Sequence, residues 1–118
     1  MKVLSYQITD TRNDLVAVDV VALCENRPEV YCRFLTSIVG TPHCQIAYGT
    51  DPTRKQLLLI DESEETGFSR DTLAVTLTHQ LESNTLYYYN VTAKGGSMNA
   101  TVFGEFRTGM CIQVVCVF

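Results

Sequence analysis

The chain has 118 residues, of which 46% are hydrophobic and 19% are charged. This composition is typical of one folded domain with its own hydrophobic core, and it excludes a disordered chain. The net charge is −4, with nine Lys and Arg residues against thirteen Asp and Glu, and the basic residues are scattered along the chain. Because a nucleic-acid surface needs clustered basic side chains, we expect no nucleic-acid partner.

Apolar and polar residues alternate with a period of two, and turn residues interrupt the alternation about every ten positions, which predicts an all-β domain. The only helix candidate, Leu15–Leu23, is rich in β-branched residues that suit a strand better. We therefore expect about eight strands. In chain order they are Lys2–Thr9, Leu15–Leu23, Val30–Leu35, Cys44–Gly49, Lys55–Ile60, Thr72–Thr78, Thr85–Ala93 and Thr101–Thr108.

The connection after residues 55–60 is acidic, because Asp61–Glu65 contains four carboxylates. Carboxylate oxygens are calcium ligands, but the segment lacks the Asp-x-Asp-x-Asp-Gly spacing of a calcium-binding loop. His43 and His79 have no ligand neighbour at the spacing of a zinc site. We expect a solvated loop at Asp61–Glu65, and neither a metal site nor a cofactor.

The segment Leu81–Ala93 carries the most specific pattern in the chain. Asn84 suits the left-handed conformation of a tight turn. The strand that follows has every second residue on its buried face, namely Tyr87, Tyr89, Val91 and Ala93. A tyrosine just after a corner can pack its ring in the core while its hydroxyl bonds an upstream main-chain group. We expect Leu81 and Tyr87 to form such a tyrosine corner.

This pattern resembles that of the fibronectin type III family: Leu, three turn residues, Thr, any residue, Tyr, then alternating apolar positions. The matching residues are Leu81, Thr85, Tyr87, Tyr89, Val91 and Ala93. Cys44–Tyr48 is similar to the family's third strand and Phe106–Thr108 to its last. The resemblance implies an immunoglobulin-like β-sandwich of two antiparallel sheets with about seven or eight strands. The sandwich would span residues 1–109, followed by an apolar tail at 110–118.

The resemblance covers Cys44–Thr108 well and residues 1–39 poorly. The family's second-strand Trp is missing, and Phe34 is expected to fill its volume. Whether Leu15–Leu23 or Val30–Leu35 is the second strand stays open, and one strand could be an N-terminal addition. Ile46–Gly49, Leu81 and Thr85–Tyr89 also look like the N-terminal sandwich of purple acid phosphatases. The metal ligands of those enzymes lie in a separate domain, so this second resemblance implies a fold and no catalysis.

Five cysteines are present: Cys24, Cys32, Cys44, Cys111 and Cys116. At most two pairs can close, which leaves one thiol free or available to another chain and permits a linked homodimer. No Cys-x-x-Cys spacing occurs, so a structural role is favoured over zinc binding. Cys24 and Cys32 flank a turn and could staple a hairpin, whereas Cys32 and Cys44 could join neighbouring strands. Of the two pairings we favour Cys24–Cys32.

Two glycosylation acceptor patterns occur, Asn90-Val91-Thr92 and Asn99-Ala100-Thr101. Alternation places Asn90 on the outward side of its strand, and Asn99 is expected in the loop after Gly95-Gly96. Leu86 and Tyr88 should project from the same sheet face as Asn90. Since exposed aromatic residues are favoured at protein interfaces, Leu86 and Tyr88 form a candidate interface.

No Ser-His-Asp order, phosphate-binding glycine loop or pair of buried carboxylates can be assembled, so we expect no enzyme. We expect instead a non-catalytic protein-binding or spacer module of an extracellular or cell-surface receptor or adhesion glycoprotein. One alternative is an accessory domain that positions or regulates a neighbouring catalytic domain. Another is a cytoplasmic structural spacer with reduced thiols.

The two ends of the sequence bear on this expectation without deciding it. Met1–Gln7 turns polar before an apolar stretch can form, so no secretion signal is predicted there. The apolar run Met110–Phe118 is too short to cross a bilayer, which needs about 20 residues. It could begin a membrane span that continues beyond Phe118, be an alternative ending, or form a last strand.

Overall fold

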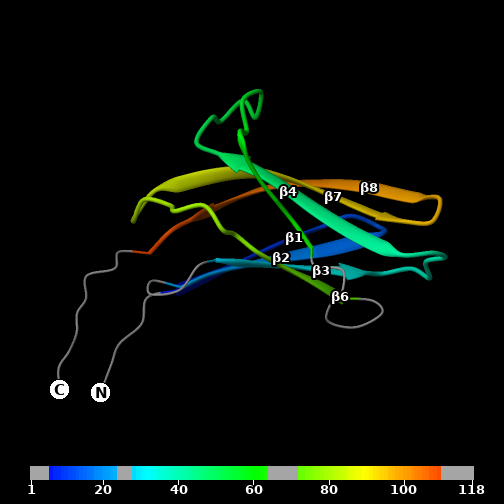
Figure 1. The fold of residues 1–118 in the computed structure, drawn as a ribbon. Coiled ribbons are helices and arrows are strands. Elements are labelled where there is room, and N and C mark those ends of the chain that lie inside the picture. Colours follow the sequence, from blue (N-terminus) through cyan, green and yellow to red (C-terminus); the bar gives the residue numbers. More distant parts are fainter. Residues whose placement is uncertain (1–5, 24–27, 64–71, 110–118) are drawn as a thin grey trace, which may run out of the picture.

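A computed structural model describes residues 6–23, 28–63 and 72–109, and the side chains of residues 6–9, 22 and 23 are not among those described. Within these ranges the chain contains no helix and forms eight strands in two antiparallel sheets of four, stacked face to face (Figure 1). The strands are β1 (Tyr6–Arg12), β2 (Val16–Leu23), β3 (Glu29–Phe34), β4 (Pro42–Gly49), β5 (Leu59–Glu62), β6 (Thr72–Thr76), β7 (Leu86–Gly95) and β8 (Met98–Arg107). The predicted all-β sandwich is confirmed. No described segment forms a helix long and apolar enough to span a membrane.

The strand order is β1-β2-β3-β6 in one sheet and β5-β4-β7-β8 in the other, and every neighbouring pair is antiparallel. The chain crosses from one sheet to the other after β3, after β5 and after β6. β1 packs against β8 along one side of the sandwich, and β6 packs against β4 and β5 along the other. The two sides are therefore closed by different strands.

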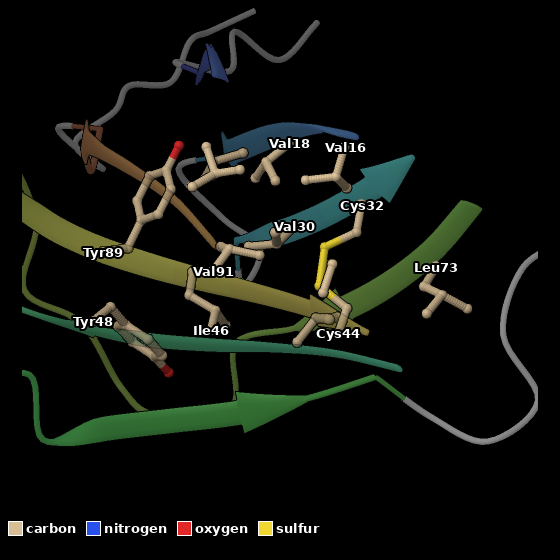
Figure 2. Packing of buried hydrophobic residues seen from close by; sticks show 14 of the residues in the cluster. Val16, Val18, Val30, Cys32, Cys44, Ile46, Tyr48, Leu73, Tyr89 and Val91 are labelled. Atoms are coloured by element: carbon tan, nitrogen blue, oxygen red, sulfur yellow. A yellow bond between two sulfur atoms is a disulfide. The ribbon is translucent and has the colours of Figure 1, made fainter. Parts of the chain in front are cut away.

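The core lies between the sheets and is lined by the alternating inward residues of the strands (Figure 2). Its fully buried members include Val16, Val18, Val20, Val30, Cys32, Cys44, Ile46, Tyr48, Val75, Tyr89 and Val91. β2 and β3 consist largely of β-branched residues, which pack well on a pleated surface. Phe34, expected to replace the missing Trp, is buried as well, at 5% exposure.

The β7–β8 hairpin turns through two residues, Gly96 and Ser97, so the loop is shorter than expected. Gly96 has φ +63°, and a Cβ at this position would come within 1.9 Å of the carbonyl oxygen of Val39. Glycine is therefore required both by the backbone conformation and by the close approach of the β3–β4 connection. The expectation that Asn99 lies in a loop is wrong: it lies in β8, opposite Lys94.

The fifth strand also differs from its expected position, Lys55–Ile60. The Asp51 side chain accepts hydrogen bonds from the N–H groups of Thr53, Lys55 and Gln56, which holds that stretch in a turn. The strand therefore begins only at Leu59 and runs through Glu62. Asn84 has φ 50°, the left-handed conformation that the sequence predicted for it. The tail at 110–118 lies outside the described residues.

Candidate functional site

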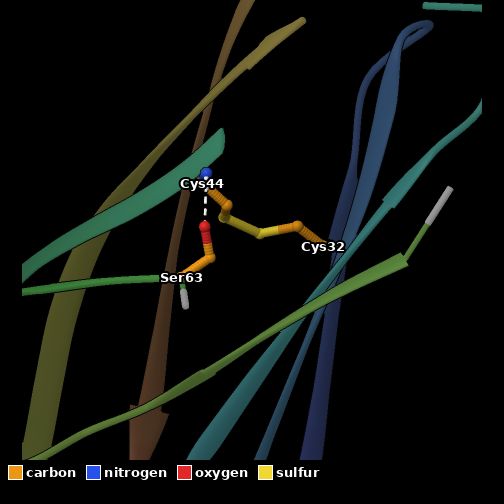
Figure 3. The surroundings of a disulfide bond; sticks show 3 residues. All are labelled: Cys32, Cys44 and Ser63. Atoms are coloured by element: carbon orange, nitrogen blue, oxygen red, sulfur yellow. Dashed lines mark hydrogen bonds between the residues drawn. A yellow bond between two sulfur atoms is a disulfide. The ribbon is translucent and has the colours of Figure 1, made fainter. Parts of the chain in front are cut away.

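A disulfide joins Cys32 of β3 to Cys44 of β4, with their Cα atoms 6.7 Å apart (Figure 3). These strands belong to opposite sheets, so the bond crosses the core, where both cysteines are fully buried. The favoured Cys24–Cys32 pairing is wrong, because the sulfur of Cys32 is bonded to that of Cys44 across the core. Cys24 lies outside the described residues. The alternative pairing is correct, although the two strands are neighbours only in sequence.

The start of β4 is tied to the end of β5 beside this disulfide. The N–H of Cys44 donates to Ser63 Oγ at 3.1 Å (Figure 3). The N–H of Ser63 donates to the Cys44 carbonyl at 2.8 Å. His43 points to the opposite face of β4, where its Nε2 lies 3.2 Å from Glu62 Oε1. The backbone on the Cys44 side of the disulfide is therefore held by two hydrogen bonds to Ser63, and the Cys44 sulfur is not a free thiol.

The predicted tyrosine corner residues come together at the start of β7. Tyr87 is 5% exposed, and its ring stacks on Phe106 with centroids 5.6 Å apart. Its hydroxyl accepts a hydrogen bond of 2.9 Å from the N–H of Glu82, five residues upstream. Thr108 Oγ1 donates to the Glu82 carbonyl at 2.5 Å, and Leu81 packs against the core. The bend before β7 is thus held by side chains on both sides.

A polar cluster that the sequence analysis missed lies where β5 faces the end of β6. The Asp61 carboxylate accepts hydrogen bonds from the Tyr48 hydroxyl, from the N–H of Thr78 at 3.0 Å and from Thr78 Oγ1 at 2.6 Å. His79 Nδ1 lies 2.9 Å from the Tyr48 hydroxyl and 3.3 Å from Asp61 Oδ2. Asp61 is 8% exposed, so the expected solvated acidic loop is wrong at this residue.

The electrostatics of this cluster follow from its burial and its hydrogen bonds. Burial alone would raise the pKa of the Asp61 carboxyl, but hydrogen bonds from Thr78, Tyr48 and His79 outweigh it and hold the pKa below its ordinary value. Burial, and then the hydrogen bond to Asp61, raise the pKa of Tyr48 above its ordinary value. A carboxylate and a neutral phenol therefore link the β5 edge of one sheet to the chain leaving β6 of the other.

One sequence signal could have revealed this cluster. Tyr48 continues the buried series of β4, and a buried tyrosine hydroxyl needs a polar partner. Asp61 follows Leu59 by two positions, so it faces the same side of β5. In the sequence Asp61 stands in a run of acidic residues, and such a run is typical of a solvated loop, so its burial was not predicted.

The solvent side of the β5-β4-β7-β8 sheet is called the outer face here. A row of four residues crosses it, with Ile60, Ala47, Asn90 and Phe103 standing opposite one another on successive strands. Ile60 is 49% and Phe103 is 59% exposed. Asn90 Oδ1 is buried and has no hydrogen-bond partner among the described residues. The row therefore combines two exposed apolar ends with an unsatisfied acceptor in its middle.

Arg54, from the turn before β5, lies over this face beside the row. Its guanidinium carbon is 5.3 Å from the centre of the Tyr88 ring, and its Nη2 donates to the Gly104 carbonyl at 3.0 Å. Leu86 and Tyr88, the predicted interface pair, are both on the outer face and both partly buried. Among the described aromatic residues of this face, the more exposed ring is Phe103.

The two glycosylation candidates occupy different environments. Asn99 is exposed near the hairpin end of β8, whereas Asn90 is partly buried in the centre of the sheet. A glycan on Asn99 would leave the sheet at its end, and one on Asn90 would cover the row.

Among residues 6–23, 28–63 and 72–109, no three His, Cys, Asp or Glu side chains gather closely enough to hold a metal ion. Comparison of the chain with protein-family models, with curated proteins and with solved structures finds no match. The fold and the geometry of the chain itself therefore carry the functional interpretation.

Proposed function

We propose that the chain is an immunoglobulin-like sandwich of the fibronectin type III kind, acting as a non-catalytic protein-binding module of an extracellular or cell-surface protein. With β2, β3 and β6 as strands A, B and E, and β4, β7 and β8 as C, F and G, the sheets divide as in immunoglobulin-like domains. β5 then extends the C-F-G sheet, and β1 is an addition beside A. The corner at Tyr87 stands at the start of F, where such domains carry a tyrosine corner.

The cross-sheet disulfide supports the extracellular part of the proposal. It joins strands B and C in this labelling, whereas antibody domains bridge B and F. Protein disulfides persist in oxidising compartments and are rare in the cytosol. A buried disulfide that connects the two sheets is therefore better suited to a secreted or surface-exposed chain than to a cytoplasmic spacer.

The observation that carries the binding role is the row across the outer face. A buried carbonyl oxygen without a hydrogen-bond partner is costly, and native proteins leave few of them. A protein segment that displaces the side chains covering Asn90 Oδ1 and places an N–H or O–H group there would satisfy this acceptor. The same segment would cover Ile60 and Phe103 on either side, giving apolar contacts around a central polar one.

The proposal is tested with a secreted, tetramerised form of the chain applied to cells, carrying a photoreactive residue at position 103. We expect it to stain cells and to cross-link to one defined surface protein. Phe103→Arg and Ala47→Arg should each abolish staining, because they place an unpaired charge on either side of Asn90. Val39→Arg is the matched control, since Val39 is 80% exposed but lies in the β3–β4 connection.

Staining that survives both outer-face substitutions would contradict the proposed surface. Staining lost equally with Val39→Arg would point to a binding site elsewhere on the domain. Each variant is compared by thermal unfolding, so that a folding defect is not mistaken for lost binding.

A further inference from the structure

The edge strands differ in length on the two sides of the sandwich. On one side the edges are β5, with four residues, and β6, with five. On the other side they are β1, with seven residues, and β8, with ten. Short edge strands protect a sheet against pairing with another chain, and long ones invite it. The β8 edge is therefore the feature of this fold most suited to strand pairing.

The hydrogen-bonding pattern of the β7–β8 ladder shows which backbone groups of β8 face this edge. The N–H of Thr108 donates to the Thr85 carbonyl at 3.0 Å. Hydrogen-bonded and non-hydrogen-bonded pairs alternate in an antiparallel ladder, so the 106–87 and 104–89 pairs are also bonded. The intervening residues direct their N–H and carbonyl groups away from β7. They are Asn99, Thr101, Phe103, Glu105 and Arg107, and all five side chains are exposed.

β1 packs against β8 from the other sheet but forms no ladder with it, so no described strand pairs with this edge. Asn13 Nδ2 lies 3.5 Å from the Thr101 carbonyl, a long and exposed contact. Such a contact is weak and easily replaced by a backbone donor. β8 contains no proline that would block pairing.

We propose that β8 pairs antiparallel with β8 of a second copy of this chain, around a twofold axis at Phe103. The two β5-β4-β7-β8 sheets then form one continuous sheet. This pairing uses the backbone edge of β8, and Phe103 is the one residue that it shares with the row on the outer face, so it is tested at Thr101 and Glu105, which lie outside the row.

The residue pattern of β8 is self-complementary in this register. Phe103 meets Phe103 of the second copy, and an aromatic pair at this position is favourable. Thr101 lies opposite Glu105 of the second copy, and Asn99 lies opposite Arg107. No like charges are opposed. A register centred on Glu105 would instead bring two carboxylates together.

The test measures self-association of the full chain by sedimentation velocity over a concentration series. Because Thr101 belongs to the Asn99 acceptor pattern, the protein is made in a host that does not glycosylate. We expect a reversible dimer that runs as a single chain on a non-reducing gel.

Two substitutions at Thr101 test the register itself. Thr101→Lys should tighten the dimer and Thr101→Glu should weaken it, because each places a charge opposite Glu105 of the second copy. Since each contact occurs twice in a twofold dimer, each dissociation constant should change by about tenfold. Thr36→Lys and Thr36→Glu make the same changes at an exposed threonine outside β8 and should change nothing.

Glu105→Pro tests the backbone pairing separately. It removes an N–H that faces the free edge and leaves the bonds to β7 intact, so the fold should persist while the dimer is lost. Thermal unfolding of this variant shows whether the domain is folded, and the Thr101 variants remain decisive if it is not.

Several outcomes would overturn the proposal. One is a full chain that stays monomeric at every concentration, including the case in which only a chain ending at Gly109 dimerises because the last residues cover the edge. Others are a disulfide-linked dimer, unchanged dissociation constants at Thr101, or the reverse order of the Lys and Glu variants.

Discussion

Tyr48 and Tyr89 stand directly opposite each other on β4 and β7, yet their hydroxyl groups bond at opposite sides of the sandwich (Figure 2). Tyr89 reaches β1, where its hydroxyl lies 2.9 Å from Thr11 Oγ1. Tyr48 reaches the other side, where its hydroxyl donates to Asp61 of its own sheet and lies 2.9 Å from His79 Nδ1, in the chain that leaves β6 of the opposite sheet. Two adjacent phenols at the centre of one sheet thus connect it to the opposite sheet at both of its margins.

The path of the Tyr89 side chain depends on Gly104, its cross-strand neighbour on β8. A Cβ at position 104 would lie 2.4 Å from the Tyr89 hydroxyl oxygen and 2.5 Å from Cζ. We expect Gly104→Ala to destabilise the domain by about 1–3 kcal/mol through overpacking, measured by urea unfolding. Gly49→Ala is the control, since its nearest contact would be an ordinary 3.4 Å. Equal effects of the two substitutions would contradict this account.

The Asp61 cluster makes stability depend on pH. The folded-state pKa of Asp61 is below its ordinary value, so the carboxylate stabilises the fold above that ordinary value, and this contribution is lost as pH falls through the folded pKa. Asp61→Asn should cost about 2 kcal/mol at neutral pH, and the difference from the unmodified chain should shrink in acid.

The measurement is urea unfolding over a series of pH values from neutral to strongly acidic. Asp14→Asn, which changes an exposed aspartate in the β1–β2 turn, is the control and should preserve the acid-dependent loss. A constant gap between Asp61→Asn and the unmodified chain across the series would show that the carboxylate charge is not the stabilising element.

The corner before β7 is tested by removing one oxygen atom. Tyr87→Phe leaves the N–H of Glu82 without its partner, and we expect a loss of about 1–2 kcal/mol in the free energy of unfolding. Tyr88→Phe removes a hydroxyl from the outer face and serves as the control. If the two substitutions cost the same, the hydroxyl of Tyr87 does not hold the corner.

The disulfide predicts a specific pattern of thiol reactivity. In unreduced protein Cys32 and Cys44 should resist alkylation, as read by peptide mass mapping, and Cys24→Ser should leave this unchanged. Replacing both bridged cysteines with alanine should cost about 2–4 kcal/mol, because the open chain gains entropy when unfolded. Five reactive thiols in unreduced, unfolded protein would contradict the disulfide and remove the support for an extracellular module.

Strand positions could be predicted from the sequence wherever burial follows simple alternation. Leu73 and Val75 on β6, and Tyr87, Tyr89 and Val91 on β7, are all buried as their spacing indicated. Side chains in a strand alternate between its two faces, so residues two positions apart face the core together. That periodicity is a local property, so it can be read without knowing how the sheets are stacked.

Relations between the sheets could not be predicted in this way. The partner of Cys32 depends on which strand of the opposite sheet lies across the core. The burial of Asp61 likewise depends on the chain leaving β6 of the other sheet, where Thr78 bonds the carboxylate. Asn99 was misplaced for a different reason, because the two-residue turn is set by the close approach of Val39 to Gly96. These features depend on contacts between segments that are distant along the chain.

The Cys32–Cys44 bond joins residues 12 positions apart and closes a loop that contains the crossing from β3 to β4. An extended chain gains about 3.5 Å per residue and the bridge itself spans 6.7 Å, so the bond withholds roughly 35 Å of length from a molecule pulled by its ends. Under tension the unfolded domain would be that much shorter than its residue count implies. A reducing agent would release the extra length in a single-molecule stretching experiment.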